Sequence, residues 1–186
     1  MKIAVFCGSS AGVDPVFAEA TAELGRYFGE QGIAVVYGGG NVGLMGIVAQ
    51  SCLNAGGEVF GVIPEALQEK EIAHPSLTEL KVVADMHERK AEMARLADAF
   101  VALPGGAGTL EEIFEAWTWA QLGYHTKACA FYNTNGYYDP LKDMISTMTS
   151  AGFLKPDYAD MLIHTDSPQA LLEAINNYVS PREKWA

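Results

Sequence analysis

The chain contains no hydrophobic run of the roughly 18–20 residues that a membrane-spanning helix needs. Basic residues are also scarce: 12 Lys and Arg stand against 23 Asp and Glu, which gives a formal net charge of −11 without any basic stripe. These absences argue against a membrane partner and a nucleic-acid partner, because nucleic acids are bound mainly through clustered basic side chains. A small phosphorylated ligand stays compatible with this charge, since one loop and one or two cations can hold a single phosphate.

Cysteine and histidine are few and scattered. Cys7, Cys52 and Cys129 lie far apart in apolar surroundings, which is typical of buried free thiols in a reducing compartment. The four histidines show no metal-ligand spacing, and the N-terminal residues run directly into a strand pattern without a signal-peptide cleavage region. We therefore expect a cytoplasmic protein with no metal and no cofactor.

Short apolar strands alternate with amphipathic helices about every 25 residues, which is typical of a parallel sheet. The pattern predicts a Rossmann-like three-layer α/β sandwich in one domain over residues 1–186, with about seven parallel strands and helices on both faces. The segment 65–77 is predicted to be irregular and 180–186 a loose tail. The predicted strands are 2–7, 33–37, 58–63, 80–84, 99–103, 128–132 and 161–164.

The most informative stretch is Leu103-Pro-Gly-Gly-Ala-Gly-Thr-Leu-Glu-Glu112, which follows a buried strand and opens a helix. Strand, glycine loop and helix N-terminus together direct free N–H groups at one point, where a phosphate fits. We expect Gly105, Gly106 and Gly108 to adopt positive φ and to let a ligand approach the backbone. The alternative is that Thr109-Leu-Glu-Glu112 is only a capping box, without chemistry.

A second glycine-rich loop covers residues 38–46 and contains Gly38-x-Gly40-x-x-Gly43, a weak match to the dinucleotide-binding fingerprint. It follows the second strand, and Glu58 is badly placed for a ribose, so these glycines could equally serve a tight turn and close packing. No Gly-Lys-Ser/Thr follows either cluster, which excludes a Walker loop. Ser9, Gly39 and Gly40 belong to loops at the carboxyl edge of the sheet, where we expect one shared pocket.

Arg89 and Lys90 lie one turn into a helix that Asp85-Met-His-Glu88 opens as a capping box. Their spacing alone is most typical of a solvated basic pair, with Met86, Met93 and Leu96 facing the core. Glu111 and Glu115 share a helix face as surface or supporting carboxylates.

Together these stretches resemble the LOG ("Lonely Guy") phosphoribohydrolases, long labelled lysine decarboxylases. Residues 104–112 are similar to the family's PGGxGTxxE motif, and Met86-His-Glu-Arg-Lys90 to its Met-x-x-Arg-Lys motif. Asn41 departs from the Ser found in many members. The resemblance covers residues 2 to about 154, and it also rests on Cys7-Gly-Ser-Ser10, Tyr37-Gly-Gly-Gly40, Val42-Gly-Leu-Met-Gly46, Gly61-Val-Ile-Pro64 and Trp119-Ala-Gln-Leu-Gly123.

The resemblance implies hydrolysis of the N-glycosidic bond of AMP or N6-isopentenyl-AMP, which yields the free base and ribose 5-phosphate. It implies that Arg89 and Glu112 are the catalytic pair, and that the enzyme is a cytoplasmic homodimer. The phosphate would lie on Gly105, Gly106, Ala107, Gly108 and Thr109, and the rest of the nucleotide site would include Glu71, Lys90, Thr118, Ser9, Gly39, Gly40 and Met86.

Two other classes stay open at this point. A non-catalytic nucleotide carrier of the same fold would bind AMP without releasing base. A pyridoxal phosphate decarboxylase would need a Schiff-base lysine with an acidic partner nearby, and neither Lys90 nor Lys127 has such surroundings in the sequence.

Overall fold

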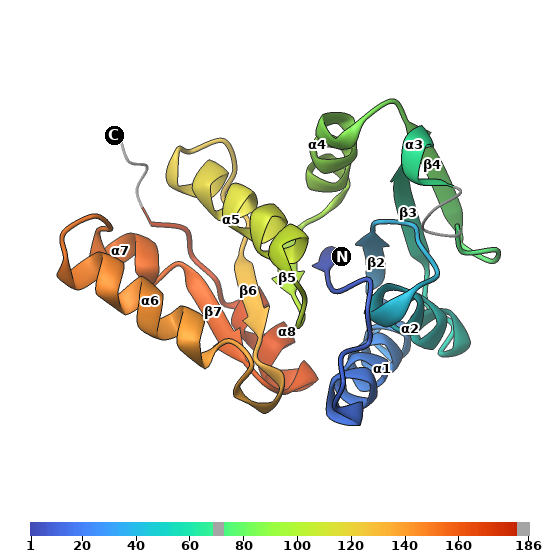
Figure 1. Ribbon diagram of the computed structural model, residues 1–186, viewed down its shortest axis with the longest axis horizontal. Coiled ribbons are helices and arrows are strands. Elements are labelled where there is room, and N and C mark those ends of the chain that lie inside the picture. Colours follow the sequence, from blue (N-terminus) through green and yellow to red (C-terminus); the bar gives the residue numbers. More distant parts are fainter. Residues whose placement is uncertain (69–72, 182–186) are drawn as a thin grey trace.

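The structure is a computed structural model that describes residues 1–68 and 73–181 (Figure 1). Its centre is one seven-stranded sheet of order β4-β3-β2-β1-β5-β6-β7, in which every neighbouring pair is parallel. The predicted parallel α/β sheet is therefore confirmed. The strands are β1 Lys2–Phe6, β2 Ala34–Tyr37, β3 Val59–Pro64, β4 Glu79–Val83, β5 Ala99–Ala102, β6 Cys129–Tyr132 and β7 Leu162–Thr165.

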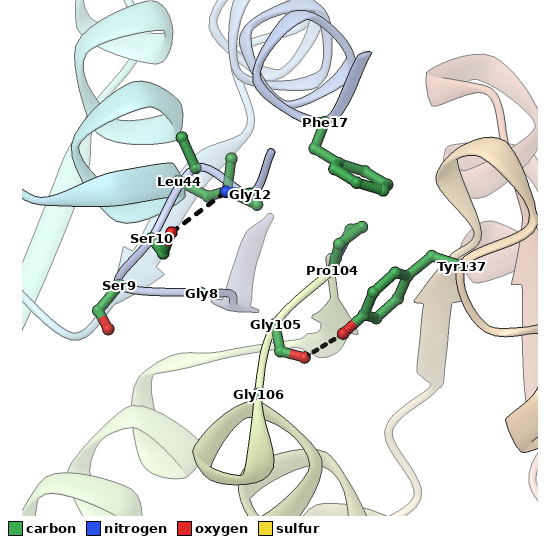
Figure 2. Close-up of a pocket in the computed structure, with 11 residues that line it drawn as sticks. Gly8, Ser9, Ser10, Gly12, Phe17, Leu44, Pro104, Gly105, Gly106 and Tyr137 are labelled. Carbon is green, nitrogen blue, oxygen red and sulfur yellow. Dashed lines mark hydrogen bonds between the residues drawn. The ribbon is translucent and has the colours of Figure 1, made fainter. Parts of the chain in front are cut away.

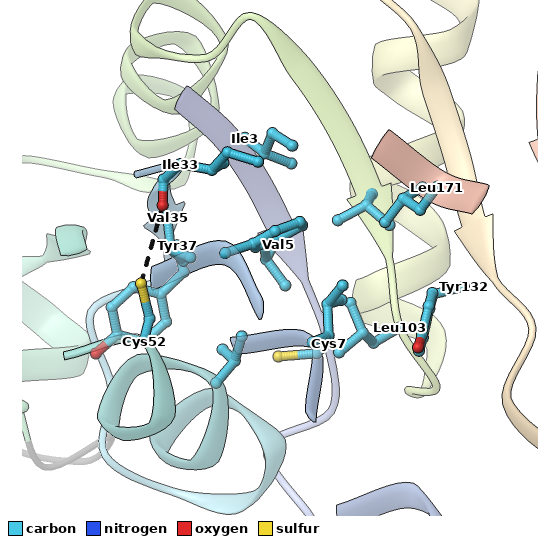
Figure 3. Packing of buried hydrophobic residues seen from close by; sticks show 14 of the residues in the cluster. Ile3, Val5, Cys7, Ile33, Val35, Tyr37, Cys52, Leu103, Tyr132 and Leu171 are labelled. Carbon is cyan, nitrogen blue, oxygen red and sulfur yellow. Dashed lines mark hydrogen bonds between the residues drawn. The ribbon is translucent and has the colours of Figure 1, made fainter. Parts of the chain in front are cut away.

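Helices cover both faces of the sheet because successive strand residues point to opposite sides. In β1, Ile3 and Val5 pack in one core cluster, which Figure 3 shows. Ala4 and Phe6 of the same strand pack in the other cluster. The first cluster includes residues of α1 Pro15–Glu30, α2 Gly43–Asn54 and α8 Pro168–Asn176. The second includes residues of α4 Met86–Leu96, α5 Ala107–Gln121, α6 Asp139–Ser150 and α7 Pro156–Ala159.

Two short helices differ from the expected pattern. The segment that was predicted to be irregular contains α3 Glu65–Gln68, and α7 was not predicted. Each has four residues, too few for a helical periodicity to be visible in a sequence. Most of the predicted tail lies outside the described residues, and α8 ends at Asn176.

The three cysteines are free and buried, as predicted. Burial raises the pKa of Cys52 to about 11 and that of Cys129 to about 12. Burial, with a smaller contribution from the negative charge of Glu112, also raises the pKa of Cys7. These thiols are therefore neutral packing groups at physiological pH.

The strand order reverses at β1. The chain builds outward through β2, β3 and β4, and then returns to place β5 on the other side of β1. The loops that leave β1 and β5 therefore diverge, and the crevice between them is where parallel α/β sheets bind ligands. Within the described residues, no helix is long and apolar enough to cross a membrane.

Candidate active site

A pocket of about 410 Å³ lies at this crevice and brings together residues of the loop after β1 and of α2, α3, α4 and α5. A volume in this range suits a small-molecule ligand. Of the residues predicted for the site, the pocket is lined by Arg89, Glu112, Met86, Ser9, Gly106, Ala107, Gly108 and Thr109. The sequence analysis did not place Cys7, Gly8, Met45, Leu67 or Glu111 in it.

The glycine loop leads into α5 without a side-chain cap. The helix begins at Ala107, and its N-cap is Gly106, which offers no side chain to the first N–H groups. The capping-box alternative is therefore wrong: Thr109 is the third helical residue and is buried, and Glu112 is the sixth rather than the third. Because the helix already begins at Ala107, Thr109 lies too far inside it to act as a cap.

The prediction of positive φ in this loop is also wrong. None of the three glycines, Gly105, Gly106 and Gly108, has a positive φ, and the φ of Gly106 is −92°. What matters at these positions is the space that a missing Cβ leaves free. A Cβ at Gly105 would collide with Thr109, whereas a Cβ at Gly106 or Gly108 would meet no protein atom within 4 Å. Two positions of the loop are thus open to a ligand.

Arg89 is buried, with 5% of its surface exposed, so it is not half of a solvated pair. Its Nη2 donates to the carbonyl oxygen of Gly38 at 3.0 Å, and its Nη1 contacts the Met86 sulfur at 3.7 Å. The Asp85 side chain caps α4 by accepting from the N–H groups of His87 and Glu88 at 2.8 and 2.9 Å, which confirms the predicted helix start. The cap and the bond to Gly38 together hold the guanidinium at the pocket.

Lys90 and Met86 lie differently from the prediction for an amphipathic helix. Met86 is 40% exposed and lines the pocket rather than the core. Lys90 forms ion pairs with Glu111 at 2.7 Å and Glu115 at 3.0 Å, with 13% of its side chain exposed. Desolvation lowers the pKa of Lys90, but bonding to the two carboxylates outweighs it and leaves the pKa raised. Lys90 thereby ties α4 to α5, the two helices that carry Arg89 and Glu112.

The remaining predicted site residues lie elsewhere or outside the described residues. Gly39 has φ +80° and faces Leu80 and Ile63, and Gly40 forms a bridge with residue 73. Thr118 is exposed further along α5. Lys90, Gly39, Gly40, Thr118 and Gly105 are not among the described residues that line this pocket, and Glu71 falls in the segment that the structure leaves undescribed. Their roles stay predictions.

A second pocket, of about 320 Å³, adjoins the first and shares Gly8, Ser9 and Gly106 with it (Figure 2). The aromatic rings of Phe17 and Tyr137 line it and meet edge to face at 5.7 Å. The glycine loop 104–106 therefore separates two hollows, one toward α4 and α5 and one toward α1.

Among residues 1–68 and 73–181, no group of three or more His, Cys, Asp or Glu side chains could hold a metal ion. The pocket instead offers an uncapped helix N-terminus, a buried guanidinium and a carboxylate. This set can bind a phosphate and stabilise a developing positive charge beside it.

Residues 45–175 match the protein-family model described as "Possible lysine decarboxylase". The chain is 46% identical to cytokinin riboside 5′-monophosphate phosphoribohydrolase LOG1 of Arabidopsis thaliana, covering 100% of this chain and 87% of that one. It is 48% identical to LOG7 of the same plant, with 95% and 82% covered. It is 44% identical to LOG of Oryza sativa, with 98% and 75% covered.

Two solved structures share the fold. A Moco carrier protein from Chlamydomonas reinhardtii superimposes with a TM-score of 0.70 at 19% identity, covering 94% of both chains. A molybdenum cofactor binding protein from Rippkaea orientalis gives a TM-score of 0.66 at 20% identity, again with 94% of both chains covered. At these identities the likeness concerns the architecture alone.

Proposed function

Because the chain belongs to the LOG family of cytokinin riboside 5′-monophosphate phosphoribohydrolases, it is an N-glycosyl hydrolase, and we propose that AMP or an N6-modified AMP binds in the pocket between α4 and α5. The reaction releases the free base, a cytokinin when N6 carries the corresponding substituent, and ribose 5-phosphate. The observation that carries the placement is the combination of an uncapped helix N-terminus with Arg89 and Glu112 in one pocket.

The 5′-phosphate lies at the start of α5 in this proposal. The N–H groups of residues 106–109 lack a capping side chain, and the helix dipole favours an anion there. The open space over Gly106 and Gly108 supports the placement, because phosphate oxygens can approach the backbone without meeting a Cβ. Binding the phosphate then fixes the ribose relative to the rest of the pocket.

Glu112 acts on the sugar. It lies less than one turn of helix beyond Thr109, so a ribose anchored through its phosphate reaches the carboxylate. Cleavage of the N-glycosidic bond develops positive charge on the ribose, and a carboxylate near C1′ stabilises that charge. Arg89, held by the carbonyl of Gly38, lines the same pocket and orients Glu112 in this proposal.

We also propose that the enzyme works as a cytoplasmic homodimer. The free thiols suit a reducing compartment. The end of α5 supplies surface for a partner copy, because Tyr124 is 76% exposed and Trp119 beside it is only partly buried. Trp117 is excluded from that surface because it is buried in the core.

A discontinuous chromatographic assay of base release tests the proposal. AMP and isopentenyl-AMP are incubated with the wild type, Glu112→Ala and the control Glu173→Ala, which changes an exposed glutamate of α8 outside the pocket lining. We expect base release from at least one substrate, a loss of two orders of magnitude or more in Glu112→Ala (about 3 kcal/mol), and a small change in the control.

A folded wild type that binds AMP and releases no base would contradict the hydrolase and favour the carrier alternative. An unchanged rate in Glu112→Ala would remove Glu112 from the chemistry.

A further inference from the structure

Two adjacent tyrosines hold the glycine loop from the side opposite the proposed phosphate. Tyr137 Oη donates to the carbonyl oxygen of Gly105 at 2.6 Å (Figure 2). Tyr138 Oη donates to that of Leu103, also at 2.6 Å. Between them, the carbonyl of Pro104 accepts from the N–H of Gly8 at 3.1 Å. Three consecutive carbonyls are thus each bound to a donor outside the loop.

Holding these carbonyls also sets the direction of the N–H groups. A peptide unit is planar and trans, so its C=O and the next residue's N–H point to opposite sides. When Tyr137 binds the carbonyl of Gly105, the N–H of Gly106 is turned away from the tyrosine. Gly106 borders both pockets, and the Tyr137 ring lines the one toward α1. The opposite direction is that of the pocket with Arg89 and Glu112.

The tyrosines are themselves held in place. The Tyr138 ring is 2% exposed and packs edge to face on Phe131, with centroids 4.7 Å apart. The backbone N–H of Tyr138 donates to Asn133 Oδ1 at 2.6 Å. The Tyr137 ring meets Phe17 at 5.7 Å and Tyr138 at 5.0 Å, both edge to face. Tyr138 is buried and Tyr137 is 42% exposed, but the ring contacts of both tyrosines preposition their hydroxyl groups as donors.

We propose that Tyr137 and Tyr138 are positioning residues that preorganise the 104–106 loop and the start of α5 for a phosphate monoester. This inference rests on the proposed function, in which the 5′-phosphate binds at the start of α5. Donors that are already aligned bind an anion without reorganising, whereas a loop with free carbonyls would have to be ordered by the ligand. With the phosphate placed on the other side of the loop, the tyrosines act through the loop alone, so we expect their effect on phosphate affinity rather than on bond cleavage.

The test is Tyr137→Phe, which keeps the ring packing and removes only the hydroxyl. Binding of AMP and of adenosine, which lacks the phosphate, is measured by calorimetry, and kcat and KM by base release. We expect AMP to bind about tenfold more weakly (about 1.4 kcal/mol), with adenosine affinity and kcat within about twofold and KM for AMP raised. Tyr138→Phe is expected to weaken AMP binding too, with a lower Tm because its hydroxyl is buried.

Tyr27→Phe is the matched control, since Tyr27 lies on α1 and lines neither of the two pockets. An unchanged preference for AMP over adenosine in Tyr137→Phe would overturn the inference, as would equal weakening of both ligands, which indicates general damage. A wild type that prefers AMP but releases no base contradicts the hydrolase alone, because the binding comparison does not need turnover. A wild type with no preference for AMP contradicts the phosphate site and the inference together.

Discussion

Two glycine-rich loops leave the same edge of the sheet, and they use glycine for different purposes. In the loop after β2, the protein itself fills the space: a Cβ at Gly38 would collide with Arg89, and one at Gly43 with the backbone of Ser9 and Ser10. In the loop after β5, the space over Gly106 and Gly108 contains no protein atom within 4 Å. The first loop is closed by packing, and the second is left open for a ligand.

This difference explains why the glycine motif at residues 38–43 resembles a dinucleotide-binding fingerprint although its space is filled by protein. Its glycines serve close packing, which was the alternative interpretation of that motif. The first loop still supports the site, because it receives the Arg89 guanidinium on the Gly38 carbonyl. A glycine pattern therefore predicts close approach, but it does not tell whether the approaching group is protein or ligand.

The largest effect is expected from Gly43→Ala in the closed loop. Gly43 has φ +54°, and a Cβ there would overlap the Ser9 and Ser10 backbone, so the helix α2 and the β1 loop must separate. We expect the free energy of unfolding to fall by about 3 kcal/mol or more in urea titration. The control Gly56→Ala also has positive φ, +81°, but no atom within 4 Å, and should lose only about 1 kcal/mol. Equal losses would mean that the backbone contact is unimportant.

Gly38→Ala should reduce activity more than stability. The new methyl group occupies the place of the Arg89 guanidinium, so the arginine must leave its bond to the Gly38 carbonyl. We expect kcat/KM for AMP to fall about 100-fold, which corresponds to about 2.7 kcal/mol. A double-mutant cycle with Arg89→Ala checks the cause: the double variant should be no worse than Arg89→Ala alone. Additive losses would show that Gly38 acts by another route.

Gly108→Ala in the open loop should separate binding from folding. Gly108 is the second residue of α5 and a Cβ there meets nothing, so Ala should preserve or raise the free energy of unfolding, by up to about 1 kcal/mol. The same methyl group stands where the phosphate is proposed, so AMP should bind about tenfold more weakly, which is about 1.4 kcal/mol. Unchanged AMP affinity in this variant would place the phosphate elsewhere.

Acid should weaken the packing of the closed loop against His74, with the smallest of these effects. The N–H of His74 donates to the Gly39 carbonyl at 3.0 Å, and its Nδ1 accepts from Ser76 at 3.3 Å. Desolvation lowers the pKa of His74 below its ordinary value of 6.5. His74 therefore takes up a proton more readily in the unfolded chain than in the folded chain. The free energy of unfolding falls as pH drops from 7 through 6.5 toward the lower pKa of the folded state.

His74→Asn keeps an acceptor for Ser76 without a titrating ring, and should reduce the slope of stability against pH in urea titrations between pH 7 and 5. Burial also lowers the pKa of His125 and His164, so part of the slope should persist. The exposed His87→Asn is the control. An unchanged slope in His74→Asn would show that the closed loop is insensitive to protonation of this residue.

The sequence predicted the sheet well because its signals are local. Apolar runs of four to six residues, glycine exits and N-caps such as Asp14 and Asp85 recur with a period that each segment displays by itself. The resemblance to the LOG motifs likewise predicted most of the residues that line the pocket. The role that the resemblance implies for Lys90 in the nucleotide site stays a prediction; its ion-pair partners Glu111 and Glu115 lie on another helix.

What the sequence by itself determined is the alternation of strands and helices and the two motifs that meet at the β1–β5 crevice. Only the tertiary structure decided which glycine loop is closed and which is open, that Arg89 is buried against Gly38, and that two tyrosines hold the loop carbonyls. Gly38 and Arg89 are 51 positions apart, and Tyr137 and Gly105 are 32 apart. Such contacts depend on how distant segments pack, and no local period in the chain records them.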